Sequence, residues 1–155
     1  MAHLVDGVAI SATLADGTTQ PATVIAVDKE HDLAVLKIDS GNDLSVATWG
    51  QSQLLQSGAA VTAIGQRADR QLSATTGAIT ALNRDVEVSP EMTYRNLLQM
   101  DAEIRRGSSG GPVLNSAGDV VGLCVTLRAG PANLSFALPS DDVRPTVLHL
   151  PTRIG

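Results

Sequence analysis

The sequence is poor in the side chains that most often cross-link or fill a protein core. Its 155 residues include one cysteine, Cys124, and only 2% aromatic residues. A single cysteine cannot form a disulfide within the chain. With so few aromatic rings, the core must be built from small and β-branched side chains, which suit the pleated surface of a sheet. These scarcities favour a β-rich fold that is held by packing alone.

Positive charge and long apolar runs are also scarce. Eleven Lys and Arg against sixteen Asp and Glu give a net charge of -5, so the chain lacks the field that gathers nucleic acid or an anionic membrane surface. No apolar run approaches the roughly 20 residues that span a bilayer, and the N-terminal residues lack the basic start and apolar stretch of a signal peptide. The composition, 43% hydrophobic and 17% charged, indicates one globular domain with no nucleic acid partner and no membrane segment.

What the chain does contain is a series of short runs of strand length, rich in Val, Ile, Thr and Ala. Gly, Asp, Asn, Ser or Pro separates these runs, as is typical of β-strands. Asp16-Gly17 and Gly118-Asp119 lie between such runs and tolerate the positive φ of a tight hairpin turn. The predicted strands are residues 8–14, 22–27, 32–38, 60–64, 72–82, 112–115 and 120–127. The pattern predicts an all-β fold, an antiparallel barrel or sandwich.

Two further segments have a distinct character. Ser140 can cap a helix, Asp141 and Asp142 favour its positive end, and Pro151 would end it. Residues 83–96 carry several charges and the least regular pattern, so they are predicted to form a long exposed loop.

The sharpest local signal is residues 106–112, Arg-Gly-Ser-Ser-Gly-Gly-Pro, in which Ser109 is flanked by glycines that let the backbone turn tightly. An activated nucleophile and a plain glycine-rich turn with a surface serine both fit this segment. A serine hydroxyl needs a base to take its proton, and the base needs a carboxylate to orient it. The chain must therefore supply a histidine and an acid.

The histidines are His3, His31 and His149, and the acid most clearly placed at a strand edge is Asp32. Using His149 would give the Ser, Asp, His order of an α/β-hydrolase, but that site needs a helix directly after the serine. Ser109 is followed by Gly-Gly-Pro-Val-Leu, the start of a strand. The order His3, Asp32, Ser109 instead matches the chymotrypsin arrangement.

Several blocks along the chain agree with that arrangement. They are Ala-His-Leu-Val-Asp-Gly (2–7), Leu-Ala-Asp-Gly (14–17), Asp-Leu-Ala-Val-Leu-Lys-Ile (32–38), Ala-Ile-Gly (63–65), Thr-Gly-Ala-Ile-Thr-Ala-Leu (76–82), Gln-Met-Asp-Ala (99–102), the glycine-rich segment (107–112) and Ser-Phe-Ala-Leu-Pro-Ser (135–140). In their order and content they resemble the HtrA/DegP-like branch of the trypsin-like serine proteases, from residue 2 to about residue 150.

The resemblance implies the chymotrypsin fold, two antiparallel β-barrels with a C-terminal helix. One trypsin-like protease domain would cover residues 1–155, with about 1–50 forming the remaining N-terminal barrel and about 51–155 forming the C-terminal barrel and helix. We expect the N-terminal barrel to be incomplete and no PDZ domain to follow. Unpaired N-terminal strands would then allow self-association.

The resemblance also implies roles for individual residues. Ser109 would attack the scissile carbonyl, His3 would accept and return the proton, and Asp32 would orient His3. The backbone N–H groups of Gly107 and Ser109 would form the oxyanion hole. The expected reaction is hydrolysis of peptide bonds in unfolded or extended proteins.

Two apolar residues are assigned to the specificity pocket by the same resemblance. Ile104 and Leu127 would form its walls, and the strand at 125–127 would pair with the bound peptide. Apolar walls favour aliphatic P1 residues such as Val, Ala or Leu, although core packing also accounts for both side chains. Protein or peptide substrates are the expected partners, and the resemblance implies a periplasmic or extracellular location.

The remaining candidates have simpler explanations. Cys124 lies in an apolar strand and is interpreted as a buried small hydrophobe, and His31 is expected to face solvent because it neighbours Asp32. No spacing of ligands suggests a metal, and no cofactor is implied. A protease-like binding or regulatory module without turnover is the alternative function, and an unrelated β-barrel carrier is a third.

Overall fold

The computed structural model describes residues 9–39, 44–66, 71–105, 107–127 and 134–148. The chain divides into two compact units. The first unit comprises Met1–Val46 and Arg144–Gly155, and the second comprises Ala47–Val143. Each unit has its own sheet.

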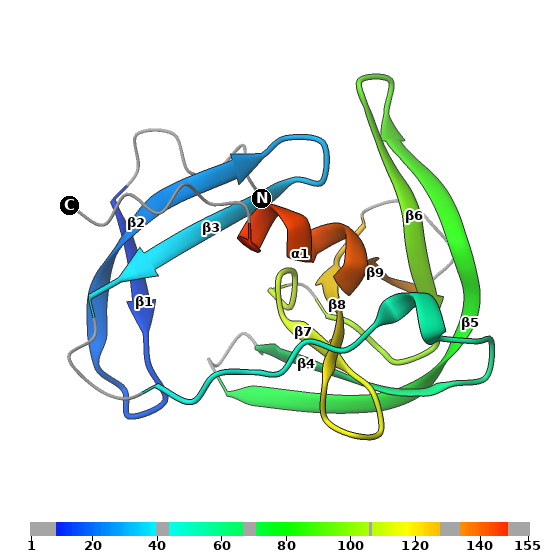
Figure 1. Ribbon diagram of the computed structural model, residues 1–155, viewed down its shortest axis with the longest axis horizontal. Helices are drawn as coiled ribbons and strands as arrows, with labels where there is room; N and C mark the ends of the chain where they lie inside the picture. The colour runs from blue at the N-terminus through cyan, green and yellow to red at the C-terminus, as the bar shows by residue number, and fades with distance from the viewer. Residues whose placement is uncertain (1–8, 40–43, 67–70, 106, 128–133, 149–155) are drawn as a thin grey trace. The chain divides into compact units, whose positions relative to one another are not determined.

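The first unit contains a three-stranded antiparallel sheet in the order β1-β2-β3 (Figure 1). The strands are β1 (Ile10–Thr13), β2 (Thr19–Asp28) and β3 (Leu33–Ile38). The predicted hairpin at Asp16-Gly17 is confirmed, with Gly17 at φ 85°. Asp16 Oδ1 accepts the backbone N–H and the hydroxyl of Thr18, at 2.9 and 2.7 Å, which fixes the turn.

The second unit contains a closed antiparallel barrel in the order β4-β5-β6-β9-β8-β7. Its strands are β4 (Ala60–Gln66), β5 (Leu72–Ser89), β6 (Met92–Met100), β7 (Pro112–Leu114), β8 (Val120–Val125) and β9 (Ser135–Pro139), and a short 3-10 helix, η2 (Ser52–Leu54), precedes them. The prediction of an all-β fold with one C-terminal helix is confirmed.

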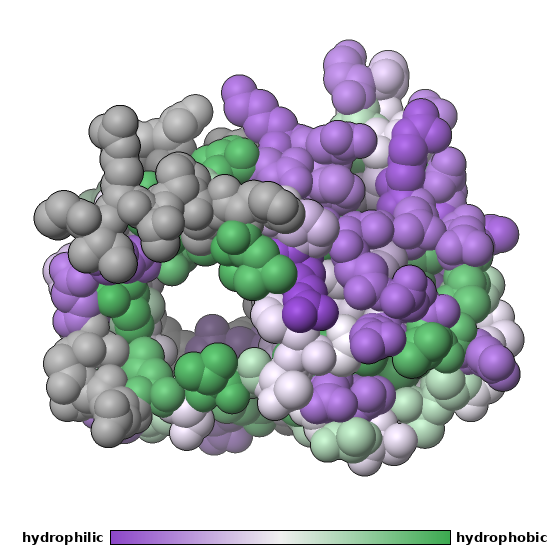
Figure 2. All heavy atoms as spheres, viewed as in Figure 1, coloured by the Kyte–Doolittle hydropathy of each residue, from purple (hydrophilic) through white to green (hydrophobic). Residues whose placement is uncertain are grey.

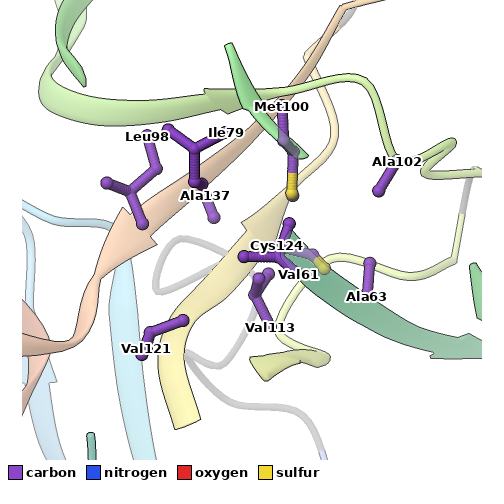
Figure 3. Close-up of a cluster of buried hydrophobic side chains, with 10 residues drawn as sticks. All are labelled: Val61, Ala63, Ile79, Leu98, Met100, Ala102, Val113, Val121, Cys124 and Ala137. Atoms are coloured by element: carbon purple, nitrogen blue, oxygen red, sulfur yellow. The ribbon is translucent and has the colours of Figure 1, made fainter. Parts of the chain in front are cut away.

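Small apolar side chains fill this barrel, as the composition requires. Figure 3 shows the cluster, in which Ile79 and Met100 are at most 1% exposed. The other members are Val61, Ala63, Leu98, Ala102, Val113, Val121, Cys124 and Ala137. Full burial of an aliphatic side chain of this size contributes about 1.5–3 kcal/mol. Packing of these residues gives β4, β7 and β8 a rigid base.

The prediction of a long loop over residues 83–96 is wrong. Most of this segment lies in the hairpin of β5 and β6, which projects beyond the other strands of the barrel in Figure 1. Val86 and Val88 are half-buried while Asp85 and Glu87 are exposed, so the segment alternates as a strand does. Its outward charges, which favoured a loop, give this region the hydrophilic surface seen in Figure 2.

The helix α1 (Ser140–Leu148) begins where the sequence predicts. Ser140 nevertheless does more than begin a helix, because its buried Oγ donates to the carbonyl of Gly50 at 3.0 Å and accepts the N–H of Ser52 at 3.2 Å. Asp141 Oδ2 accepts from Ser52 Oγ at 2.9 Å. These bonds tie the start of α1 to the segment that leads into the barrel. Within the described ranges, no helix is long and apolar enough to cross a bilayer.

Candidate active site

Ser109 lies in a tight turn between β6 and β7. Gly107 and Gly110 adopt φ of +96° and +85°, a region that glycine enters without steric cost. The N–H of Ser108 donates to the carbonyl of Arg105 at 3.0 Å, and the N–H of Gly111 donates to the carbonyl of Ser108 at 2.9 Å. The glycines that mark this motif in the sequence are therefore required by the turn itself.

The end of β8 holds one side of this turn. Gly110 and Cys124 are joined by a bond from the N–H of Gly110 to the carbonyl of Cys124, at 2.9 Å, and Cys124 N–H donates to the carbonyl of Gly111 at 2.8 Å. Thr126 N–H donates to Ser109 Oγ at 3.0 Å. Because Oγ is the acceptor there, its own hydrogen remains available to a base. Sequence reasoning missed Thr126, since a backbone donor leaves no side-chain signature.

The backbone donors of the turn are also available. Across the described part of the chain, neither the N–H of Gly107 nor that of Ser109 has a hydrogen-bond acceptor. Gly107 is exposed, Ser109 is half-buried, and the Ser108 side chain between them is 6% exposed. Two N–H groups without an acceptor in the described ranges, on residues at and near the serine, can stabilise the negative charge that develops on a carbonyl oxygen when the serine attacks the carbonyl carbon.

Ile104 and Leu127, the predicted pocket walls, have different surroundings. Ile104 is half-buried, packs against the barrel core and lines a pocket of about 200 Å³ together with Ser108 and Cys124. Leu127 is half-buried beyond the end of β8 and does not line that pocket. The structure thus brings Ile104, and not Leu127, to a pocket beside the Ser109 turn.

A pair of exposed charges also lines this pocket. Arg105 Nε donates to Glu103 Oε1 at 3.0 Å, and this hydrogen bond raises the pKa of Arg105. Both side chains are more than half exposed, so water screens the pair and its contribution to stability is small. The pocket is therefore apolar at Ile104 and also carries the ion pair of Arg105 and Glu103. The sequence predicted apolar walls only.

Asp32 belongs to the first unit and lies in the turn between β2 and β3. Its φ is +52°, a left-handed conformation that Asp and Asn enter more readily than other side chains. Asp28 closes this turn, because its Oδ1 accepts the N–H groups of Glu30 and His31 at 3.0 and 3.1 Å. Hydrogen bonds to the Asp28 carboxylate thus stabilise the turn that contains Asp32.

The second oxygen of Asp28 is equally occupied. Oδ2 lies 2.9 Å from His31 Nδ1 and accepts the hydroxyl of Thr146, in α1, at 2.8 Å. Burial opposes ionisation of Asp28, but the hydrogen bonds from His31 and Thr146 outweigh it and lower the pKa of this carboxyl. The expectation that His31 faces solvent is wrong, since its side chain is 29% exposed and paired with Asp28.

His3 and His149 lie outside the described residues. The convergence of His3, Asp32 and Ser109 stays a prediction. Cys124 is 2% exposed and burial raises its pKa to about 11, so its thiol is protonated at neutral pH and is a poor nucleophile. Among the residues that the structure describes, no cluster of three or more His, Cys, Asp or Glu side chains could hold a metal ion.

Comparison with known proteins identifies the family of the chain. The trypsin-like peptidase domain family matches residues 2–123. "Serine protease Do-like HtrB" of Bacillus subtilis is 40% identical over 155 residues, covering 96% of this chain and 34% of the relative. "Serine protease Do-like HtrA" of the same species is 37% identical, with 96% and 34% covered. "Probable periplasmic serine endoprotease DegP-like" of Pseudomonas savastanoi is 41% identical over 143 residues, with 90% and 29% covered.

The chain belongs to the trypsin-like peptidase domain family. Within that family its relatives include serine proteases of the HtrA and DegP type. The chain spans about a third of the length of these curated relatives.

Proposed function

We propose that the chain carries a serine endopeptidase activity, with Ser109 as the nucleophile. The observation that carries the proposal is the Ser109 turn: Thr126 N–H donates to Oγ at 3.0 Å, and the backbone N–H groups of Gly107 and Ser109 have no acceptor among the described residues. Membership of a peptidase family whose relatives are named serine proteases supports the same chemistry. A serine held only for turn formation would need neither feature.

The proposed reaction is acyl transfer to Ser109 followed by hydrolysis. His3 takes the Oγ proton as Oγ bonds to the scissile carbonyl carbon, and returns it to the leaving amine as the C–N bond breaks. Asp32 holds His3 in the required tautomer and stabilises its imidazolium form. The N–H groups of Gly107 and Ser109 stabilise the oxyanion, and water then releases the acyl group by the same steps in reverse.

The proposed substrates are unfolded or extended proteins. An extended peptide would pair with the backbone at the end of β8, next to Thr126, in the manner of an added strand. Ile104 would contact the P1 side chain, which favours Val, Ala or Leu over a cation. The packing of Ile104 against the pocket beside the turn supports its part in this selection.

The location and the assembly are also proposals. One relative is named periplasmic, and on that basis we place the chain's activity outside the cytoplasm. Among the described strands of the first unit, β1 pairs with β2 alone, and Ile25, Val27 and Leu36 are 42–43% exposed. An unpaired strand edge with exposed apolar side chains supports self-association through this sheet.

The test is digestion of a reduced, carboxymethylated protein by the purified chain, with mass spectrometry of the products. We expect cleavage after Val, Ala or Leu by the natural chain and none by Ser109→Ala. Binding of the unfolded protein without cleavage would overturn the proposal and favour the module without turnover. Cleavage that survives in Ser109→Ala would assign the activity to another source.

A further inference from the structure

The end of β4 forms a floor beneath the Ser109 turn. Gly65 has no side chain, and the Ser108 side chain occupies the space in front of it. A Cβ atom on Gly65 would lie 2.6 Å from Ser108 Cβ and still closer to Ser108 Oγ, which is shorter than real Cβ contacts. Because the contact involves Ser108 Cβ as well as Oγ, rotating the Ser108 side chain about χ1 would not relieve it.

The residues on either side of Gly65 meet the same turn. A Cβ on Gly107 would lie 3.3 Å from the carbonyl oxygen of Gln66, and a Cβ on Gly111 would overlap the carbonyl oxygen of Ile64. Three consecutive residues of β4 therefore each face one residue of the turn. This floor is held in place because all three residues pair with β5, and β4 also pairs with β7 just before it, at Thr62 and Ala63.

We propose that Gly65 is a positioning residue for the oxyanion hole. The space that it leaves receives the Ser108 side chain and so fixes the two peptide planes that flank Ser108. The second plane carries the N–H of Ser109, and the first holds the carbonyl of Gly107, whose own N–H lies one peptide earlier. The inference rests on the proposed function. A displacement of about 1 Å at reacting groups can cost about a hundredfold in rate, and loss of one oxyanion donor costs about 10²–10³ in kcat.

A purely structural role for Gly65 makes a different prediction. If the contact with Ser108 only packed the barrel, filling it would lower stability, and the activity of the remaining folded protein would be unchanged. The experiment must therefore separate the rate per folded molecule from the amount of folded molecule.

The test combines Gly65→Ala, Ser108→Gly and the double variant. The double variant moves one small side chain across the contact, from residue 108 to residue 65, where an added Cβ would lie 3.4 Å from the Ser108 Cα, an ordinary distance. The matched control is Gly50→Ala, whose Cβ would press on Val121 Cγ1 at 2.9 Å, away from the turn. Folded fraction is measured by urea denaturation.

The first readout is the rate at which a fluorophosphonate labels Ser109, per folded molecule. We expect Gly65→Ala to label about a hundredfold more slowly and the double variant to label faster than either single variant. Gly50→Ala should lose stability but keep its labelling rate. Labelling of Gly65→Ala at the natural rate, or a double variant slower than Ser108→Gly, would overturn the inference, and the second comparison holds even if Gly65→Ala alone does not fold.

The second readout does not depend on activity. The amide NMR resonances of Gly107 and Ser109 should shift in Gly65→Ala and return toward their natural positions in the double variant. Unshifted amides would overturn the inference. Shifted and restored amides together with no labelling of the natural chain would support the packing contact while overturning the proposed function, which keeps the two failures distinguishable.

Discussion

At the scale of single residues, the two acids near the β2–β3 turn have different tasks. Asp28 uses both carboxylate oxygens to hold the turn and the end of α1, with four hydrogen bonds between 2.8 and 3.1 Å. Asp32 follows in a left-handed conformation. The Asp28 carboxylate stabilises the turn, and Asp32 is the residue that the turn holds in place.

Asp32→Asn tests the proposed role of Asp32 in orienting His3 and stabilising its imidazolium form. Asn also adopts the left-handed conformation readily, so the turn should persist while the charge that supports the imidazolium is lost. We expect kcat for peptide hydrolysis to fall by about 10⁴ with little change in KM. The exposed turn variant Asp16→Asn is the control and should retain full kcat, whereas an active Asp32→Asn would remove Asp32 from the mechanism.

Asp28→Asn tests the structural role of the Asp28 carboxylate through the pH dependence of stability. The folded state lowers the Asp28 pKa below its usual 3.8, so the unfolded chain binds the proton more readily and stability is lost as pH falls through the folded pKa. At neutral pH the variant should lose about 1–3 kcal/mol of unfolding free energy. Below the usual pKa this difference should shrink, as measured by urea denaturation from about pH 6 to about pH 2.

The control for that series is Asp39→Asn. Asp39 is 94% exposed and pairs with Lys37 at 3.6 Å, so its removal should change stability by less than about 1 kcal/mol at every pH. A difference between the natural chain and Asp28→Asn that stayed constant down to acid pH would contradict the role given to the Asp28 charge.

Alkylation of Cys124 tests the burial of β8, the strand that is hydrogen-bonded to the Ser109 turn. Its pKa of about 11 and 2% exposure leave almost no thiolate at neutral pH. Iodoacetamide should therefore leave the folded chain unmodified and alkylate it once in denaturant, as read by intact mass. Rapid alkylation of the native chain would show that the end of β8 opens readily.

At the scale of elements, β5 has its middle in the core and its first residue in solvent. Ile79 is 1% exposed and Leu72 is 75% exposed on the same strand. Ile79→Ala should cost about 2–5 kcal/mol because it leaves a cavity, and Leu72→Ala should change stability by less than about 0.5 kcal/mol. Urea denaturation measures both, and equal costs would contradict the packing of the barrel.

The strands were predictable where apolar side chains recur near turn residues. The segments predicted at 22–27, 32–38, 60–64 and 72–82 fall on or overlap β2, β3, β4 and β5. The outer part of the β5–β6 hairpin was missed because its charged side chains face outward, and charge alone does not distinguish an exposed strand from a loop. Its half-buried partners Val86 and Val88 carried the signal.

The site was predictable in part for a related reason. The Ser109 turn could be predicted from its glycines, because glycine adopts the positive φ of residues 107 and 110 without steric cost. The contacts of Thr126 with Ser109, of Asp28 with Thr146 and of Gly65 with Ser108 join residues that lie far apart in the chain, and one sequence gives no signal for such pairs. The pocket walls show the same limit, because spacing alone could not separate Ile104 from Leu127.

At the scale of the whole molecule, the chain places its candidate chemistry in two units. The barrel of the second unit rigidly supports Ser109 and its backbone donors, and the sheet of the first unit carries Asp32. Relatives of which this chain spans about a third are serine proteases by name. We propose that Ser109 is activated by His3 and Asp32.

The most direct measurement is labelling of the 155-residue chain with a fluorophosphonate, read by intact mass. We expect one adduct on the natural chain, and none on Ser109→Ala or His3→Ala, because the reaction needs the nucleophile, its base and the oxyanion hole together. No adduct on the natural chain, or an adduct that persists in Ser109→Ala, would contradict the claim.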